Sequence, residues 1–184
     1  MAISFTHTLQ EALQSINHQS SSPQNHKTHE FEVHNNKIHK INPQCPNFLS
    51  RYSEALHQVT SLTNTHFKQL PHTSQIIIDM PFNLHNWINH NESDELAYFL
   101  SETGNNCLNH APSNAPHKFT LHLGTKGFVI SISHQGQGFN AEHINKNKLY
   151  KNEGAAFDFY RNCQNTIFFN NPQNTTEIFM LHLF

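Results

Sequence analysis

The strongest structural signal in this chain is the run LSETGNNCLNHAPSNAPHKFTLHLGTKGFVISISHQGQGF at residues 100–139. Its first part has apolar residues at helical spacing and stops at Pro112, which lacks the N–H that a helix interior needs. Apolar residues then alternate with polar ones at 119–123 and again at 128–132, on either side of the turn 124–127. Alternation around a turn with two glycines predicts a β-hairpin.

The segments on both sides of this run complete the expected fold. Upstream, we expect a helix from about Ser93 to His110, with Asn91 or Ser93 as its N-cap. Downstream, the loop 134–139 is followed by a polar segment, a helix and two strands, expected at 140–152, 154–164, 166–169 and 177–183. This order indicates an α+β fold, a two-layer α/β sandwich with helices on one face of a mixed, mostly antiparallel sheet.

The N-terminal part of the chain carries weaker signals. The stretch 1–30 is polar from residue 17 onward and has no apolar period there, so we expect a flexible or partly helical arm. The remainder, 31–184, has the length of one domain, which divides into an N-terminal elaboration at 31–90 and a motif region at 91–184. Within the elaboration the patterns predict a small hairpin, an amphipathic helix and a buried strand, at 31–41, 47–70 and 74–80.

The composition excludes several classes of function. The formal net charge is -2 and the pI is about 6.8, so no broad basic face predicts binding to nucleic acid. No stretch approaches the roughly 20 apolar residues that cross a bilayer, and the opening residues lack a signal-peptide pattern, so we expect a cytoplasmic protein without a membrane partner. Cys45, Cys107 and Cys163 are widely spaced, which predicts reduced thiols rather than disulfides or a thiolate zinc site.

One face of the expected helix carries polar residues at regular spacing. Glu102, Asn106 and His110 are four positions apart and therefore lie on one side, whereas the apolar residues of the helix lie on another. A carboxylate, an amide oxygen and an imidazole that project together can activate a water molecule and hold a divalent cation. The plain alternative is an ordinary solvated helix face, for which polar residues at this spacing are also typical.

The same helix resembles a known motif. The stretch LSETGNNCLNHA is similar to the N-box helix of the ATPases that include gyrase, histidine kinases and anti-sigma serine kinases. In that motif a Glu, an Asn and a His-Ala pair follow one another with three residues between them. Glu102, Asn106, His110 and Ala111 fall at these positions.

Two later stretches resemble the glycine motifs of the same family. FVISISHQGQGF is similar to its strand and turn of the form Asp-x-Gly-x-Gly-Phe, and it matches at Gly136, Gly138 and Phe139. EGAAFDFYRNCQNTIFF and NTTEIFMLHLF resemble the second glycine motif with its helix and the closing Gly-Gly-Thr strand, and they match at Gly154 and Thr176. Landmarks that occur in the family's order imply the Bergerat-type ATPase fold, closest to the anti-sigma serine kinases.

The resemblance also implies roles for individual residues. Glu102 would be the general base or the group that positions water, and Asn106 would be the ligand of magnesium, with His110 beside it. Gly136 and Gly138 would let the backbone approach adenine and the phosphates of ATP, because glycine has no side chain in the way. Gly154 would open a helix that faces phosphate, Thr176 would belong to the nucleotide site, and residues 140–152 would be a lid.

The sequence departs from the family pattern where nucleotide would be contacted. His134 stands where the family has the Asp that accepts the adenine amino hydrogen. Ala155 and Ala156 follow Gly154 where a further glycine is common, and Asn174-Thr175 replaces the final Gly-Gly. Added side chains crowd a phosphate site, so a relative that no longer binds ATP is a competing interpretation.

Two functions follow from the resemblance and stay open at this point. The first is a regulatory protein that binds ATP and magnesium, phosphorylates a serine on a partner and acts by partner switching, with a sigma factor or an antagonist as partner. The second is a non-catalytic interaction module, dimeric through the helix at 47–70, or a phosphotransfer variant with His57 or His66 as acceptor. The plain alternative is that His57 and His66 are ordinary surface histidines in contact with solvent.

The histidine content raises a further hypothesis. His is a common metal ligand, and the cluster His26, His29, His34 and His39 supplies the four ligands that a closed site needs. The gaps between these residues match no zinc pattern, and histidines are frequent throughout the chain. Metal binding here therefore ranks below both functions above.

Overall fold

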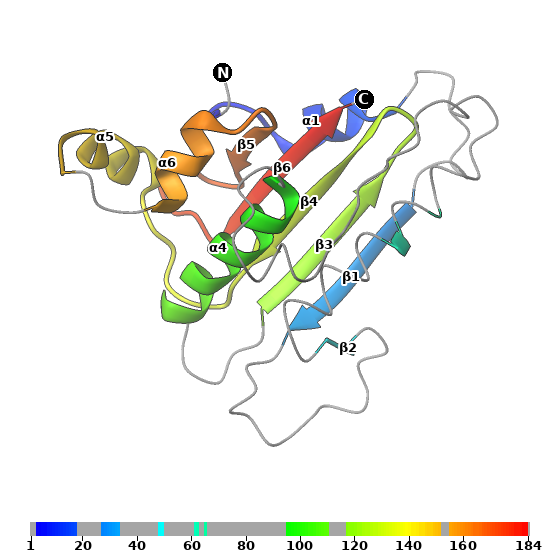
Figure 1. Cartoon of the computed structure of the whole chain (residues 1–184), viewed down its shortest axis with the longest axis horizontal. Helices are drawn as coiled ribbons and strands as arrows, with labels where there is room; N and C mark the ends of the chain where they lie inside the picture. The colour runs from blue at the N-terminus through cyan, green and yellow to red at the C-terminus, as the bar shows by residue number, and fades with distance from the viewer. Residues whose placement is uncertain are drawn as a thin grey trace.

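The computed structural model describes residues 3–17, 27–33, 48–49, 61–62, 65, 95–110, 117–151 and 155–183. The helices are α1 (Leu9–Ser15), α4 (Glu95–His110), α5 (Ala141–Lys151) and α6 (Ala155–Asn162). The strands are β1 (Lys27–Val33), β2 (Phe48–Leu49), β3 (His117–Leu123), β4 (Gly127–Ser133), β5 (Thr166–Phe169) and β6 (Glu177–Leu183). Figure 1 shows one sheet with α4, α5 and α6 grouped on the same side of the molecule.

The sheet has six strands in the order β2-β1-β3-β4-β6-β5. All neighbours pair antiparallel except β1 and β2, which pair parallel. The predicted hairpin is confirmed as β3 and β4, with Leu121 opposite Ile130. The predicted strands at 166–169 and 177–183 are confirmed as β5 and β6, so the chain has the expected α+β class and a mostly antiparallel sheet.

Successive residues of each strand point to opposite faces of the sheet, and apolar side chains lie on both faces. On one face, side chains of β3, β4, β5 and β6 pack against α4 and α6 in the main core. Phe99 and Leu100 of α4 and Tyr160 of α6 are almost fully buried there. The strand residues in this core are Phe119, Leu121, Leu123, Phe128, Ile130, Ile132, Ile167, Phe169, Ile178 and Met180.

The opposite face has a smaller core under α1. Ala12 and Ile16 are fully buried against strand residues that alternate with those of the main core, namely Val129, Phe168, Phe179 and Leu181. The expectation of helices on one face only is therefore corrected. Within the arm expected to be flexible or partly helical, residues 3–17 pack on the sheet, because α1 carries apolar residues at helical spacing that cover this second face.

The boundaries of the other helices agree in part with those predicted from the sequence. α4 ends at His110 as predicted, whereas Asn91 and Ser93, the expected N-caps, lie outside the described residues. The polar segment 140–152 contains a helix, α5, that its pattern did not predict. Asn140 caps it, because its Oδ1 accepts the backbone N–H of His143 at 2.8 Å.

The structure describes only a few of residues 31–90, so it tests only part of what we expected for this segment. β1 begins at Lys27 and pairs with β3 and β2, and the second strand of the expected hairpin lies outside the described residues, as does the strand at 74–80. A helix starting at residue 47 is wrong, since Phe48–Leu49 form β2, although 61–62 and 65 are helical. Apolar spacing does not reveal hydrogen bonding to a distant strand such as β1, which is what makes these residues a strand.

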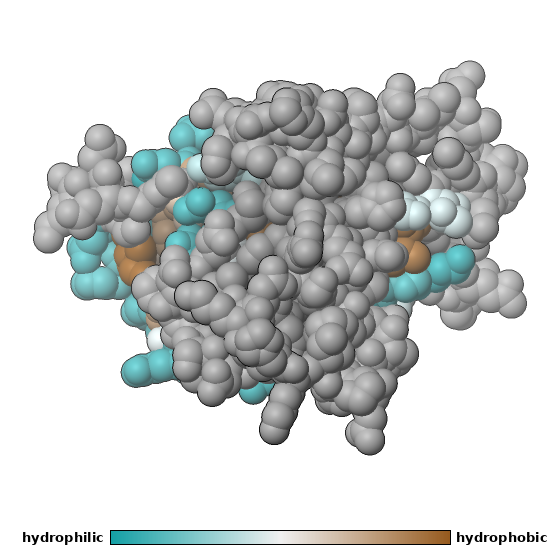
Figure 2. Space-filling view, turned by 60° about the horizontal axis from the view of Figure 1, so that its bottom comes forward, coloured by the Kyte–Doolittle hydropathy of each residue, from teal (hydrophilic) through white to brown (hydrophobic). Residues whose placement is uncertain are grey.

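The described surface is mainly polar. Leu183, with 51% exposure, is the one large hydrophobic side chain that the described residues expose. Among the residues that are coloured in Figure 2, hydrophobic areas lie next to hydrophilic ones. Among the described helices, none is long and apolar enough to span a membrane.

Candidate functional site

Helix α4 is held in one rotational position by its buried face. Leu96, Phe99 and Leu100 pack into the main core, and Thr103 is fully buried beside them. The Thr103 hydroxyl forms a hydrogen bond of 2.7 Å with the hydroxyl of Tyr160 on α6. This packing fixes which way the remaining residues of α4 point.

The first residue of α4 anchors the helix to the connection between α6 and β5. The Glu95 carboxylate accepts the backbone N–H groups of Gln164 at 2.6 Å and Asn165 at 3.1 Å, the Asn165 amide at 2.5 Å and the Cys163 thiol at 2.9 Å. Burial works to raise the pKa of Glu95, but these hydrogen bonds outweigh it and hold the pKa below its ordinary value. Spacing alone did not identify Glu95 as an anchor, because its donors lie far away in the sequence.

Cys163 is a structural thiol. Burial, together with the hydrogen bond to Glu95 and the charge of Glu95, raises its pKa to about 12. A thiol with this pKa stays protonated at neutral pH and is a poor nucleophile. Cys163 is a free thiol, as predicted; it is buried and donates a hydrogen bond to Glu95.

Glu102 and Asn106 form a pair on the polar side of α4. The Asn106 amide Nδ2 lies 3.4 Å from Glu102 Oε1, one helical turn away, and both side chains are half-buried. Because Nδ2 faces the carboxylate, the Oδ1 acceptor lies on the other side of the amide group. His110 ends the helix, and its side chain lies outside the described part of the structure.

His134 is the first residue after β4, and its ring is engaged within the loop. Its Nδ1 accepts the backbone N–H of Gly136 at 3.0 Å, and its own backbone N–H donates to the Thr176 carbonyl at 3.1 Å. A neutral imidazole has one acceptor nitrogen, so this contact uses it and places the ring proton on Nε2. His134 is also buried, with 9% exposure.

His117 is a second buried histidine at this end of the sheet, and the sequence analysis missed it. Since Lys118 pairs with Ser133, His117 at the start of β3 lies opposite His134. Its side chain is fully buried, and neither ring nitrogen has a hydrogen-bond partner among the described residues. Burial, helped by the charge of His134, lowers its pKa to about 4. Its position two residues before Phe119 was a signal that it faces the main core.

The glycine-bearing loop packs against the loop before β6. Phe139 and Thr175 exchange two backbone hydrogen bonds of 3.0 and 2.7 Å. A Cβ added to Gly138 would lie 2.1 Å from the side-chain oxygen of Asn174, so a larger residue here requires the Asn174 side chain to move. The structure thus brings together four of the predicted residues, His134, Gly136, Gly138 and Thr176.

Thr176 forms hydrogen bonds with Asn170 in the turn before β6. The Thr176 hydroxyl accepts a hydrogen bond of 3.0 Å from the Asn170 amide, and its backbone N–H donates to the Asn170 oxygen at 3.2 Å. These contacts hold the turn before β6 in shape. Gly154 lies outside the described residues, although the helix expected there is present as α6, which begins at the next residue, Ala155.

The predicted lid segment is docked as helix α5. The Ala141 N–H donates to the Pro172 carbonyl at 2.8 Å, and Ala141 is fully buried. Further along, the Arg161 guanidinium of α6 donates to Asn145 at 2.9 Å and forms an ion pair with Asp158. The segment therefore makes contacts with both α6 and the loop before β6.

The metal hypothesis receives no support within the described residues. They contain no group of three or more His, Cys, Asp or Glu side chains arranged to hold a metal ion. Of the four histidines proposed as ligands, His29 is described, and burial followed by the charge of Lys27 lowers its pKa. His26, His34, His39 and the acceptor candidates His57 and His66 lie outside the described residues.

No known protein-family model, curated protein or solved structure matches this chain. The resemblance to the ATPase family therefore stays a prediction from the motifs.

Proposed function

We propose that this chain is a regulatory interaction domain with the layout of the anti-sigma and histidine kinase ATPase domains, in which the adenine contact is lost. One observation carries the second half of the proposal. The Nδ1 atom of His134, at the position of the family's adenine-binding carboxylate, already accepts the Gly136 N–H.

The layout is supported by the order and packing of the elements. A helix with Glu102 and Asn106 on its polar side precedes the β3–β4 hairpin, and the loop 134–139 follows that hairpin directly. The loop with Thr176 lies against it through backbone hydrogen bonds. This is the arrangement that the motif resemblance implies for the Bergerat-type fold.

The loss of the adenine contact follows from the number of acceptors. A carboxylate has two oxygens and can accept a loop N–H and a ligand amino group together. The neutral His134 ring has one acceptor nitrogen, which the Gly136 N–H occupies. A hydrogen bond to a charged group contributes about 1.5–3 kcal/mol, so its loss weakens binding by roughly ten- to a hundredfold.

The second candidate is a regulator that still binds ATP with magnesium. The pair Glu102 and Asn106 favours it, because the Asn106 oxygen is turned away from the carboxylate and suits a cation that prefers oxygen ligands. When bound, magnesium would supply positive charge beside the phosphates. Glu102, half-buried one turn away, would then hold or accept a proton from a nearby hydroxyl or water.

Both candidates act through a protein partner. The resemblance implies partner switching with a sigma factor or an antagonist, and the near-neutral composition suits a protein partner better than nucleic acid. In the first candidate, the sheet and α5 serve as the docking surface without a bound nucleotide.

Calorimetric titration with a non-hydrolysable ATP analogue and magnesium distinguishes the two candidate functions. We expect no binding by the native chain below millimolar nucleotide, and at least a tenfold gain in affinity for His134→Asp, which restores the missing acceptor. Asn106→Ala in the His134→Asp background should remove that gain. Micromolar binding by the native chain that is lost in Asn106→Ala would instead establish the second candidate.

A further inference from the structure

The glycine-bearing loop is anchored at both ends to the loop before β6. At one end the His134 N–H donates to the Thr176 carbonyl at 3.1 Å, and at the other Phe139 and Thr175 exchange backbone hydrogen bonds of 3.0 and 2.7 Å. Residues 135–138 lie between these anchors, partly exposed to solvent. The loop is therefore a short span that is fixed at its ends.

One hydrogen bond closes the span between the anchors. The Gly136 N–H donates to the Nδ1 atom of His134, 3.0 Å away. Within the part of the chain that the structure describes, this is the one hydrogen bond that residues 135–138 form. Its acceptor belongs to the side chain type whose charge changes between about pH 5 and pH 8. The closed form of the span thus depends on a nitrogen that can take up a proton.

Protonation of His134 removes this acceptor. A charged imidazole carries a proton on both nitrogens, so it can only donate. The new N–H at Nδ1 would face the Gly136 N–H, and two donors would point at each other across 3.0 Å. The closed loop therefore excludes a proton that an open loop accepts. Because the state that binds more protons gains as the pH falls, acid favours the open loop.

The side chain opposite His134 on the neighbouring strand is also a histidine. His117 points to the same face of the sheet and is fully buried, and neither of its ring nitrogens has a hydrogen-bond partner among the described residues. A neutral imidazole supplies no negative charge, and a positive charge at this depth has a high free energy of desolvation. A proton on His134 is therefore better accommodated when its ring reaches solvent.

Other titratable side chains lie on the elements that pack around His134. They are Lys118 on β3, Glu177 on β6, Glu102 on α4, and Glu142 and His143 at the start of α5. The Glu177 carboxylate accepts the Ser131 hydroxyl at 2.6 Å, on the face of the sheet that α1 covers. Glu102 contacts Asn106 along α4. His117 is thus the titratable group that the strand register places directly opposite His134.

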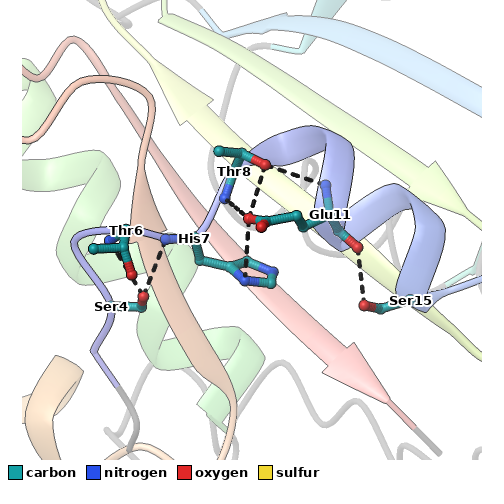
Figure 3. A network of polar contacts seen from close by, with 6 residues as sticks. All are labelled: Ser4, Thr6, His7, Thr8, Glu11 and Ser15. Carbon is teal, nitrogen blue, oxygen red and sulfur yellow. Dashed lines mark hydrogen bonds and ion pairs between the residues drawn. The ribbon is translucent and has the colours of Figure 1, made fainter.

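His7 shows how the same fold accommodates a charged histidine elsewhere. Its Nδ1 lies 3.8 Å from the Glu11 carboxylate, four residues along the chain (Figure 3). The same carboxylate accepts the Thr8 N–H at 2.8 Å, which holds it in place. A proton on His7 therefore gains an ion pair, whereas a proton on Nδ1 of His134 breaks a hydrogen bond.

We propose that His134 is a pH-sensitive latch, which closes the glycine-bearing loop while its ring is neutral and releases residues 135–138 when its ring is protonated. Release separates Gly138 from the Asn174 side chain, its close neighbour in the closed loop. The surface beside α5 then changes with pH, and α5 belongs to the proposed docking surface. This consequence for a partner rests on the proposed function, whereas the latch itself needs neither partner nor nucleotide.

NMR relaxation of the full chain tests the latch without a ligand. In the native chain the backbone order parameters of residues 135–138 should be about 0.85 at neutral pH and below about 0.6 near pH 5. The order parameters of β4 should stay near 0.85 at both pH values, because the sheet remains folded. The amide proton resonance of Gly136 should move with the same midpoint as the ring resonances of His134.

His134→Asn distinguishes the latch from other effects of pH. The Asn side-chain oxygen occupies the place of Nδ1 and commonly accepts the N–H two residues along, but it does not titrate. The loop of this variant should stay ordered at both pH values, whereas the loop of His134→Leu, which has no acceptor, should be disordered at both. His143→Asn removes an exposed histidine on α5 and should respond to pH as the native chain does.

Four results would overturn the proposal. Equal order of the native loop at both pH values means that a proton does not open it. Disorder in acid in His134→Asn means that another group controls the loop, and an ordered loop in His134→Leu means that the hydrogen bond to Gly136 does not close it. Disorder of β4 together with the loop means that acid unfolds the sheet. These samples contain no nucleotide, so each outcome is independent of the calorimetric test of the proposed function.

Discussion

The hydroxyl of Thr103 lies 2.7 Å from the hydroxyl of Tyr160 in the buried interface between α4 and α6. This hydrogen bond ties the helix that carries Glu102 and Asn106 to the helix that follows the predicted lid. Each hydroxyl satisfies the other where no solvent reaches the Thr103 side chain. The bond therefore couples stability to the geometry of the candidate site.

Tyr160→Phe should lower the free energy of unfolding by about 1–2 kcal/mol, because the Thr103 hydroxyl is left buried without a partner. Adding Thr103→Val should cost little more, since both polar groups are then gone. Urea denaturation of the two single variants and the double variant measures the coupling. Additive losses would show that the two hydroxyls do not depend on each other.

Glu95→Gln should destabilise the chain by roughly 2–3 kcal/mol, since an amide cannot accept all the hydrogen bonds that the carboxylate accepts. The pKa of Glu95 is lowered in the fold, so the stability that it contributes is present above its unfolded pKa, near 4.5, and is lost as the pH falls through the folded pKa. Denaturation curves from pH 7 to pH 3 should show a shallower loss in Glu95→Gln than in the native chain. Glu142→Gln, on α5, serves as the matched control, and equal pH profiles for all three proteins would contradict this assignment.

His117→Leu should make the free energy of unfolding less dependent on pH between pH 7 and pH 5. The His117 pKa falls to about 4 in the fold, whereas the unfolded value is 6.5, so acidification through this window favours the unfolded chain, which binds more protons. Allowing for partial screening by solvent, the native chain should lose about 1–2 kcal/mol between pH 7 and pH 5 through this residue. Thermal unfolding at the two pH values tests this, and a loss as large in His117→Leu as in the native chain refutes it.

Gly138→Ala should destabilise the loop at 134–139 by about 1–2 kcal/mol, because the added methyl group meets the Asn174 side chain. The double variant with Asn174→Ala should recover most of the loss, since the two closest atoms are then removed. Both variants are compared by thermal unfolding. Failure of the second substitution to rescue the first would mean that the two loops do not pack as described.

The elements with strong local patterns could be predicted from the sequence. The β3–β4 hairpin and strands β5 and β6 appear where alternation places them, and α4 ends where Pro112 forces it to stop. The strand Phe48–Leu49 could not be predicted, because it exists through pairing with β1. The helix α5 could not be predicted either, because its sequence is mostly polar and has no clear apolar period.

The candidate site could be predicted only as a set of residue types. Spacing placed Glu102 and Asn106 on one face of a helix, and that pairing is present in the fold. The engagement of His134 by Gly136, by contrast, depends on the shape of a loop and on which ring nitrogen faces which backbone group.

The sequence by itself determined the order of the patterned elements α4, β3, β4, α6, β5 and β6 and the two faces of their strands, since apolar periodicity is a local property of neighbouring residues. Only the tertiary structure decided that α1 covers the second face, that His117 lies opposite His134, and that Glu95 holds the connection before β5. These relations join residues far apart in the chain. They arise from long-range packing and hydrogen bonding, which local periodicity does not record.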